Sequence, residues 1–133
     1  MKINKINENK SEIFHSKKGL VSIIIPIYNG ESRIEELINS LMVQTYKNIE
    51  IITVDNNSTD DSISILKKLD NKKILLKIFS NKKNEGYCGG CNKGIEKANG
   101  EFLLFLSQDR IMNYDWIEKT IEEINKNEET CCV

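Results

Sequence analysis

Apolar residues along the chain recur at two spacings in turn, one typical of buried strands and one typical of amphipathic helices. Four short runs rich in branched and aromatic side chains have strand length and little polar alternation, as strands buried on both faces do. They predict strands over 21–25, 49–54, 74–79 and 101–106. Pro26 is expected to end the first strand, because proline cannot continue the hydrogen-bond ladder of a central strand.

The stretches that follow these runs carry apolar residues every three or four positions, which indicates helices with one buried face. The predicted helices cover 31–42, 87–98 and 115–125, and a further one begins near 58–60 and continues to Leu69. Ser, Thr and Asp at 58–60 are typical helix caps, and Asn99-Gly100 is a common helix terminator. Four strand–helix repeats predict a mostly parallel sheet with helices on both faces, a three-layer α/β/α fold.

Length and composition indicate one globular domain. The 133 residues suffice for a core, and 39% apolar with 29% charged residues is typical of soluble proteins. We expect this domain over 20–128, after a polar leader over 1–19 that is disordered or briefly helical, and before a tail over 129–133. A formal charge of −1 argues against a nucleic-acid partner, and no apolar run suits a membrane span or a signal peptide. A cytoplasmic protein is therefore expected.

The four cysteines lie in two pairs. Cys88 and Cys91 have the spacing of a zinc or redox pair, whereas Cys131 and Cys132 are adjacent. Structural zinc sites need two spaced pairs on converging turns. Small residues that fill a tight turn are therefore the favoured interpretation of the first pair, and zinc or redox chemistry is the alternative.

Polar and small residues follow every predicted strand. These segments are 26–30, 55–60, 81–86 and 107–110. In open α/β folds the carboxyl ends of parallel strands meet at one edge of the sheet, where ligands bind. Asp55 and Asp109 each end an apolar strand, so we expect them to face a common polar pocket. The alternative is that the Asn, Asp and Gly residues only make turns and helix caps.

Taken together, these segments resemble the family 2 glycosyltransferases, nucleotide-sugar enzymes with the GT-A fold. The resemblance runs from about Leu20 to Ile124. Its parts are VSIIIPIYN at 21–29, VDNNSTD at 54–60, NEGY at 84–87, GG at 89–90, NKGI at 92–95, ANGE at 98–101, LSQD at 106–109 and DW at 115–116. Each block is weakly specific, but their order and spacing together are strongly so.

The resemblance implies roles for the residues at the sheet edge, in the binding of a nucleoside-diphosphate sugar that is UDP- or dTDP-linked. Pro26, Tyr28 and Asn29 would line the nucleoside pocket. Asp55 and Asn56 would meet the base and ribose, since such groups pair with imide and hydroxyl groups. The alternative for Asp55 is a helix cap, and Ser58 and Asp60 are assigned mainly to capping. The remaining donor-binding residues implied are Asn84, Gly86, Asn92, Ser107 and Gln108.

Asp109 stands at the last position of the family's Asp-any-Asp metal element, so the resemblance implies that it binds Mg²⁺ or Mn²⁺. These hard cations take carboxylate and phosphate oxygens. Ser107 replaces the first Asp of that element and is a weaker ligand. Arg110 either adds positive charge for a diphosphate or is simply solvated. The glycines at 89–90 either bring backbone amides close to the donor or ease helix–strand packing.

The chain ends about one helix after Asp109, whereas the general base of the family lies further downstream. Asp115 is expected to start a helix, and His15 to be solvated in the leader. The expected protein is thus the donor-binding half of a glycosyltransferase with a glycan, lipid or protein acceptor. We expect it to be truncated and prone to self-association. It is expected in the cytoplasm, free or at the inner face of the membrane. The alternatives are a relic that serves as a nucleotide-binding or interaction module, and a flavodoxin-like receiver or FMN module.

Overall fold

The computed structural model describes residues 16–70 and 75–126, in which strands and helices alternate. Their four strands form one parallel sheet in the order β3-β2-β1-β4. The elements are β1 (Lys17–Ile27), α1 (Ile34–Met42), β2 (Ile49–Asp55), α2 (Ser62–Leu69), β3 (Leu75–Ser80), α3 (Gly86–Lys97), β4 (Gly100–Phe105) and α4 (Trp116–Lys126).

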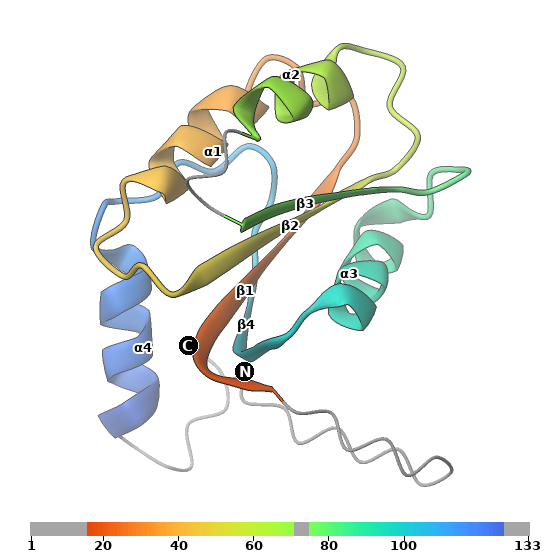
Figure 1. Cartoon of the computed structure of the whole chain (residues 1–133). Helices are drawn as coiled ribbons and strands as arrows, with labels where there is room; N and C mark the ends of the chain where they lie inside the picture. Colours follow the sequence, from red (N-terminus) through yellow and green to blue (C-terminus); the bar gives the residue numbers. More distant parts are fainter. Residues whose placement is uncertain (1–15, 71–74, 127–133) are drawn as a thin grey trace, which may run out of the picture.

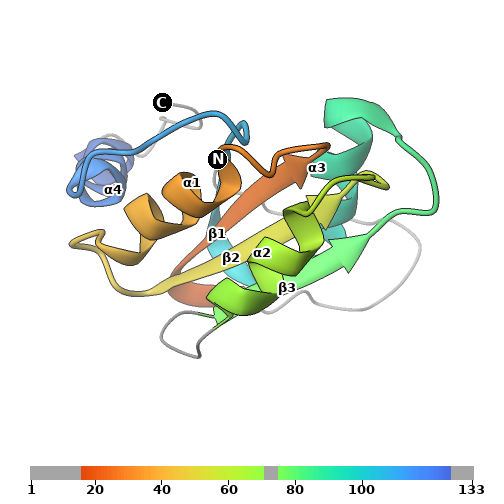
Figure 2. The same cartoon turned by 90° about the horizontal axis from the view of Figure 1, so that it is seen from above.

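Helices cover both faces of the sheet, which confirms the predicted three-layer α/β/α fold. Figure 1 shows α3 on one side of the sheet with α1 and α2 on the other, and Figure 2 shows α4 beside α1. The larger core packs side chains of α1, α2 and α4 against β1, with Ile23 and Ile25 fully buried in it. The smaller core lies under α3 and includes Ile24 and Ile52. Among the described residues no helix is long and apolar enough to cross a membrane.

Glycine lets α3 lie unusually close to the sheet. A Cβ added at Gly94 would stand 2.3 Å from Cγ2 of Ile24, and one at Gly90 would stand 2.7 Å from Cβ of Pro26. Both distances are far below van der Waals contact. Of the two interpretations of the glycines at 89–90, the geometry at Gly90 therefore favours close packing of α3 on the sheet.

The expected end of the first strand at Pro26 is wrong, because β1 continues to Ile27. Alternate residues of a parallel strand direct their backbone groups to alternate neighbours: the carbonyl of Ile24 accepts from Leu106 N after β4, and that of Ile27 accepts from Asn56 N after β2. Pro26 therefore faces the side on which β4 has already ended at Phe105, and its missing N–H removes no ladder bond.

Other element boundaries differ by a few residues. β1 begins at Lys17, and α1 begins at Ile34 after a turn over 31–33. α2 begins at Ser62, after the expected caps at 58–60. Gly100 does not terminate α3, which ends at Lys97; it is the first residue of β4, where an added Cβ would stand 2.6 Å from the carbonyl oxygen of Leu20. Residues 1–15 of the expected leader, 127–128 of the expected domain and the whole expected tail over 129–133 lie outside the described residues.

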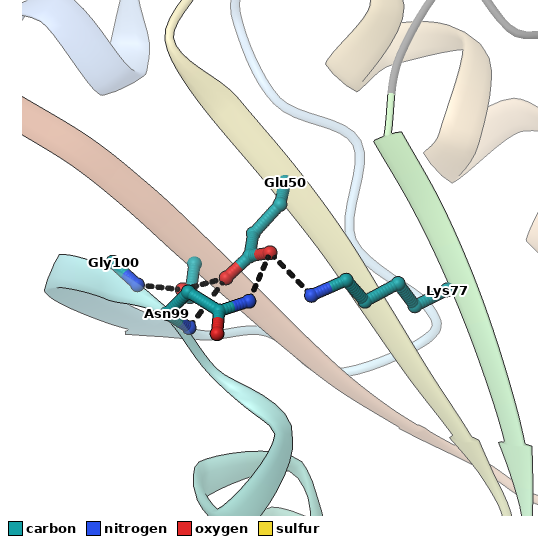
Figure 3. A network of polar contacts seen from close by, with 5 residues as sticks. Glu50, Lys77, Asn99 and Gly100 are labelled. Carbon is teal, nitrogen blue, oxygen red and sulfur yellow. Dashed lines mark hydrogen bonds and ion pairs between the residues drawn. The ribbon is translucent and has the colours of Figure 1, made fainter. Parts of the chain in front are cut away.

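A buried carboxylate ties the turn after α3 to the sheet (Figure 3). Glu50, near the start of β2, has no exposed side-chain surface and lies 2.7 Å from Nζ of Lys77 in β3. Its carboxylate also accepts hydrogen bonds from Ser22 Oγ and, at 2.7 Å, from the backbone N–H of Asn99. This network fills the edge of the sheet opposite to the polar loops, so its role is structural.

Candidate functional site

The loop after β1 is hydrogen-bonded to the loop after β4 by a two-way contact. Nε2 of Gln108 donates to the carbonyl oxygen of Tyr28 at 3.0 Å, and the backbone N–H of Tyr28 donates to Oε1 of Gln108 at 2.9 Å. Gly30 packs against the same side chain, since an added Cβ there would stand 2.8 Å from Oε1 of Gln108. Gln108 therefore joins the ends of β1 and β4.

The other side of the β1 loop is bonded to the loop after β2. Oδ1 of Asn29 accepts from the backbone N–H of Thr59 at 2.9 Å, while Asn29 N–H donates to Oγ of Ser58 at 2.9 Å. Gly30 N–H donates to Oγ of Ser62 at 2.8 Å. Asn29 adopts a left-handed backbone with φ of 48°, a conformation that asparagine tolerates better than most residues. The ends of β2 and β4 thus lie on one edge of the sheet, with the β1 loop between them. That Asp55 and Asp109 face a common pocket stays a prediction.

Asp55, at the end of β2, is only 4% exposed. Its two carboxylate oxygens lie 3.2 and 3.3 Å from the backbone nitrogen of Ser58. This contact shapes the loop but does not cap α2, which begins four residues later at Ser62. Ser58 does not cap α2 either, because its hydroxyl serves Asn29; Asp60 does bind the backbone N–H of Ser62 at 3.0 Å.

Asn56 is nearly buried, and both ends of its side-chain amide have partners in the protein. Oδ1 accepts from Nδ2 of Asn81 at 2.9 Å, and Nδ2 donates to the carbonyl oxygen of Gly86 at 3.1 Å. The side chain therefore fixes the loop after β3 and the start of α3. Gly86 has φ of 72°, and its N–H donates to Oδ1 of Asn84 at 2.8 Å, which holds the exposed entry to the helix.

Asp109 is exposed at the end of the β4 loop. A hydrogen bond from Ser107, the backbone N–H of Asp109 itself, and the charges of Arg110 and Arg33 hold the pKa of its carboxyl below the ordinary value. Within 16–70 and 75–126, no three His, Cys, Asp or Glu side chains gather closely enough to hold a metal ion. One carboxylate and one hydroxyl fit a cation such as Mg²⁺ or Mn²⁺ that takes most of its ligands from phosphate and water.

Buried side chains in α1 and just after its end hold the segment that follows Asp109. Gln44, which is 1% exposed, donates to the carbonyl oxygen of Asn113 at 2.6 Å and accepts from the backbone N–H of Ile117 at 3.1 Å. Ser40 Oγ accepts from Met112 N–H at 3.2 Å. No motif in the sequence marked Gln44, because its partners lie about seventy residues away.

A hollow of about 760 Å³ opens between the loop after β3 and the face of α3. Asn92 lies in its lining, and Asn81 connects it to the β2 end through the bond from Asn81 N–H to the carbonyl oxygen of Asp55. Asp55 and Asp109 are not part of this lining. Two half-exposed aromatic rings lie in the elements at this edge, Tyr28 in the β1 loop at 46% and Tyr87 in the first turn of α3 at 49%. Tyr87 is not among the expected binding residues.

The cysteine pair of α3 does not form a bonded site. Cys88 is exposed and Cys91 is buried, and both thiols are free. Burial raises the pKa of the Cys91 thiol. Cys131 and Cys132 lie outside the described residues.

Comparisons with known proteins agree on one family. The family model described as Glycosyl transferase family 2 matches residues 22–133. An uncharacterised glycosyltransferase of Haemophilus influenzae is 38% identical over 108 residues, which are 81% of this chain and 43% of that protein. The GalNAc(5)-diNAcBac-PP-undecaprenol beta-1,3-glucosyltransferase of Campylobacter jejuni is 37% identical over 90 residues, 67% of this chain and 29% of that protein. The chain thus spans less than half the length of these relatives.

Two solved structures are similar in fold. The crystal structure of S. aureus TarS 1–349 in complex with UDP matches with a TM-score of 0.75 and 34% identity, over 81% of this chain and 32% of that one. The mannosyltransferase PcManGT from Pyrobaculum calidifontis, in complex with GDP-Man and Mn²⁺, matches with a TM-score of 0.75 over 78% of this chain and 32% of that one. Its 23% identity speaks for the fold alone.

Proposed function

Because the chain belongs to glycosyl transferase family 2, we propose that its polar sheet edge binds a nucleoside-diphosphate sugar, UDP- or dTDP-linked, together with a divalent cation. The bound sugar is destined for a glycan, lipid or protein acceptor. The observation that carries this proposal is the pair of hydrogen-bonded junctions on either side of the β1 loop, through Gln108 and through Asn29. These junctions bring the acidic ends of β2 and β4 to one edge of the sheet. A nucleotide-sugar donor, with a base at one end and a diphosphate at the other, needs contacts at both places.

The nucleoside end of the donor is assigned to the β1–β2 side of the edge. The Asp55 carboxylate can accept from the imide N–H of uracil or thymine, and Tyr28 offers a half-exposed ring on which a base can stack. Pro26 and Asn29 complete this side of the edge. Asn56 supports the site from behind, because its amide is already occupied by Asn81 and Gly86.

The entry to α3 is assigned to the donor as well. Asn84 and Gly86 lie at the exposed start of the helix, and Asn92 lines the neighbouring hollow. The solved structures of S. aureus TarS in complex with UDP and with UDP-GlcNAc share 34% and 33% identity with this chain. This likeness supports a nucleotide-sugar donor for the present chain.

The diphosphate end is assigned to the β4 loop, where Asp109 with Ser107 would hold Mg²⁺ or Mn²⁺ and Gln108 would keep the loop in place. A bound cation would offset the charge that builds on the departing nucleoside diphosphate. No general base is assigned: Asp115 forms an ion pair of 2.6 Å with Lys119 at the start of α4, which agrees with a helix-start role.

Isothermal titration calorimetry tests the proposal with UDP, dTDP and GDP, each with and without Mn²⁺. We expect heat with UDP or dTDP that increases with Mn²⁺. Asp55→Asn should weaken this binding, because the amide has one acceptor oxygen and no charge, whereas the carboxylate has two oxygens to accept from the imide and from Ser58. Asp70→Asn, at the far end of α2, removes an equal charge and serves as the matched control.

The proposal is wrong if no nucleotide produces heat at about 1 mM, the upper end of usual Michaelis constants. Binding without sugar transfer would instead identify the chain as a nucleotide-binding module.

A further inference from the structure

The chain has only two arginines, and each ends a short turn in the polar loops at the edge of the sheet. All other cationic side chains are lysines, apart from His15. Arg33 and Arg110 are far apart in the sequence, yet their two turns meet where Gly30 packs against the side chain of Gln108. Two arginines at one place, in a chain whose other cationic side chains are almost all lysines, indicate a role that lysine fills poorly. Arginine differs from lysine in its planar fork of donors, which matches two phosphate oxygens at once.

Two turns in contact with each other carry these arginines. Arg33 N–H donates to the carbonyl oxygen of Gly30 at 3.0 Å, and Arg110 N–H donates to that of Ser107 at 3.3 Å. Each arginine is therefore the fourth residue of its turn. The turns touch where Gly30 packs against Gln108, the residue that also bonds Tyr28. The contact brings the two turns that carry the arginines to the same end of the site.

Within 16–70 and 75–126, neither guanidinium group forms an ion pair with Asp109. The one described ion pair of an arginine joins Arg33 to Glu36 at 3.6 Å, with both side chains 61% exposed. Such an exposed pair is worth little and opens readily. The two arginines thus provide donors and positive charge at a place where the protein offers a cation only one carboxylate.

We propose that Arg33 and Arg110 bind the diphosphate of the donor from two sides. They would neutralise part of the diphosphate charge that a cation held by two carboxylates would otherwise neutralise. This inference rests on the proposed function, since it concerns the diphosphate end of the same site. Nucleoside diphosphate binding should therefore persist when divalent cations are removed.

The experiment measures the affinity of the whole chain for UDP, UMP, dTDP and dTMP by calorimetry, in EDTA and in Mn²⁺. In EDTA the wild type should retain binding of UDP or dTDP, whichever of the two binds more tightly in Mn²⁺. Arg33→Gln and Arg110→Gln should each weaken diphosphate binding in EDTA by about tenfold, the factor that corresponds to 1.4 kcal/mol. The monophosphate should be affected less, because it has one phosphate for two arginines.

Two further variants separate fork geometry from charge and from general electrostatics. Arg110→Lys keeps the charge and should recover only part of the lost affinity, because an ammonium group cannot make the two parallel bonds. Lys67→Gln, exposed near the end of α2 remote from the loops, should bind as the wild type does. Circular dichroism and thermal unfolding show whether each variant is folded.

The outcomes distinguish this inference from the proposed function. Diphosphate binding that vanishes in EDTA, or that is unchanged in both arginine variants, overturns the role of the arginines and leaves the donor site intact. Absence of binding by all four nucleotides even with Mn²⁺ overturns both.

Discussion

Replacement of Glu50 by glutamine tests the buried network that holds the α3–β4 turn. Glutamine has the same shape, but one carboxylate oxygen becomes an amide donor. The carboxylate accepts from Ser22 and Asn99 and pairs with Lys77, so the new donor faces groups that can only donate, or a hydroxyl that must turn around. The substitution therefore removes at least one hydrogen bond to a charged group and leaves another donor unsatisfied.

The expected loss follows from these contacts. A hydrogen bond to a charged group contributes about 1.5–3 kcal/mol, and an unsatisfied buried donor costs about 1–3 kcal/mol. Lys77 is 25% exposed and can regain water, which reduces the penalty on its side. We expect Glu50→Gln to lower the free energy of unfolding by about 2–4 kcal/mol at pH 7. Glu122→Gln, on the exposed face of α4, should change it by less than about 0.5 kcal/mol.

The effect should depend on pH. Burial alone would raise the pKa of Glu50, but hydrogen bonds from Lys77, Ser22 and Asn99 outweigh it and hold the pKa below the ordinary 4.5. Because the folded pKa is the lower one, this carboxylate stabilises the fold fully above pH 4.5 and loses its contribution as pH falls from there through the folded pKa. The difference between wild type and Glu50→Gln should therefore shrink in acid.

Urea unfolding followed by circular dichroism, at pH 7 and at steps down to acid, measures both quantities. The double mutant with Lys77→Met completes a cycle that isolates the ion pair, for which we expect coupling of about 0.5–3 kcal/mol. Equal stability of Glu50→Gln and wild type at pH 7, or a difference that does not fall in acid, would refute the reasoning.

The other predictions concern packing and the loops. Gly94→Ala should destabilise the fold by about 1–3 kcal/mol in urea unfolding, because its Cβ would stand 2.3 Å from Ile24. The double variant with Ile24→Ala should lose less stability than the sum of the two single losses, and additive losses would contradict the contact. Gln108→Ala should speed hydrogen exchange at the Tyr28 amide and weaken UDP binding by up to about tenfold, whereas unchanged exchange would mean that this side chain does not hold the loop. Asp109→Asn should abolish the gain in UDP affinity on adding Mn²⁺ and leave binding in EDTA unchanged, so a persisting Mn²⁺ gain would move the cation elsewhere.

The alternation of elements and the polar strand ends could be predicted from the sequence, because each depends on neighbours within one or two turns. Apolar spacing marked all four strands to within a few residues at their ends, and it identified the buried face of α1, with Ile34, Leu37, Ile38 and Leu41 inside. The motifs implied the family for a related reason: a nucleotide-binding edge demands particular residue types directly after particular strands. Parallel pairing then placed Asp55 and Asp109 on one edge without further information.

The tertiary structure alone decided what each polar residue does there. β1 continues through Pro26 because β4 ends earlier. The side-chain amide of Asn56 is hydrogen-bonded to Asn81 and Gly86, neither of which is a neighbour in sequence. Glu50 is buried because Ser22, Lys77 and Asn99 converge on it, and Arg33 belongs with Arg110 only through the contact of Gly30 with Gln108. Periodicity reports which face of an element is apolar, but hydrogen-bond partners and charge neighbours are set by which segments the folded sheet brings together.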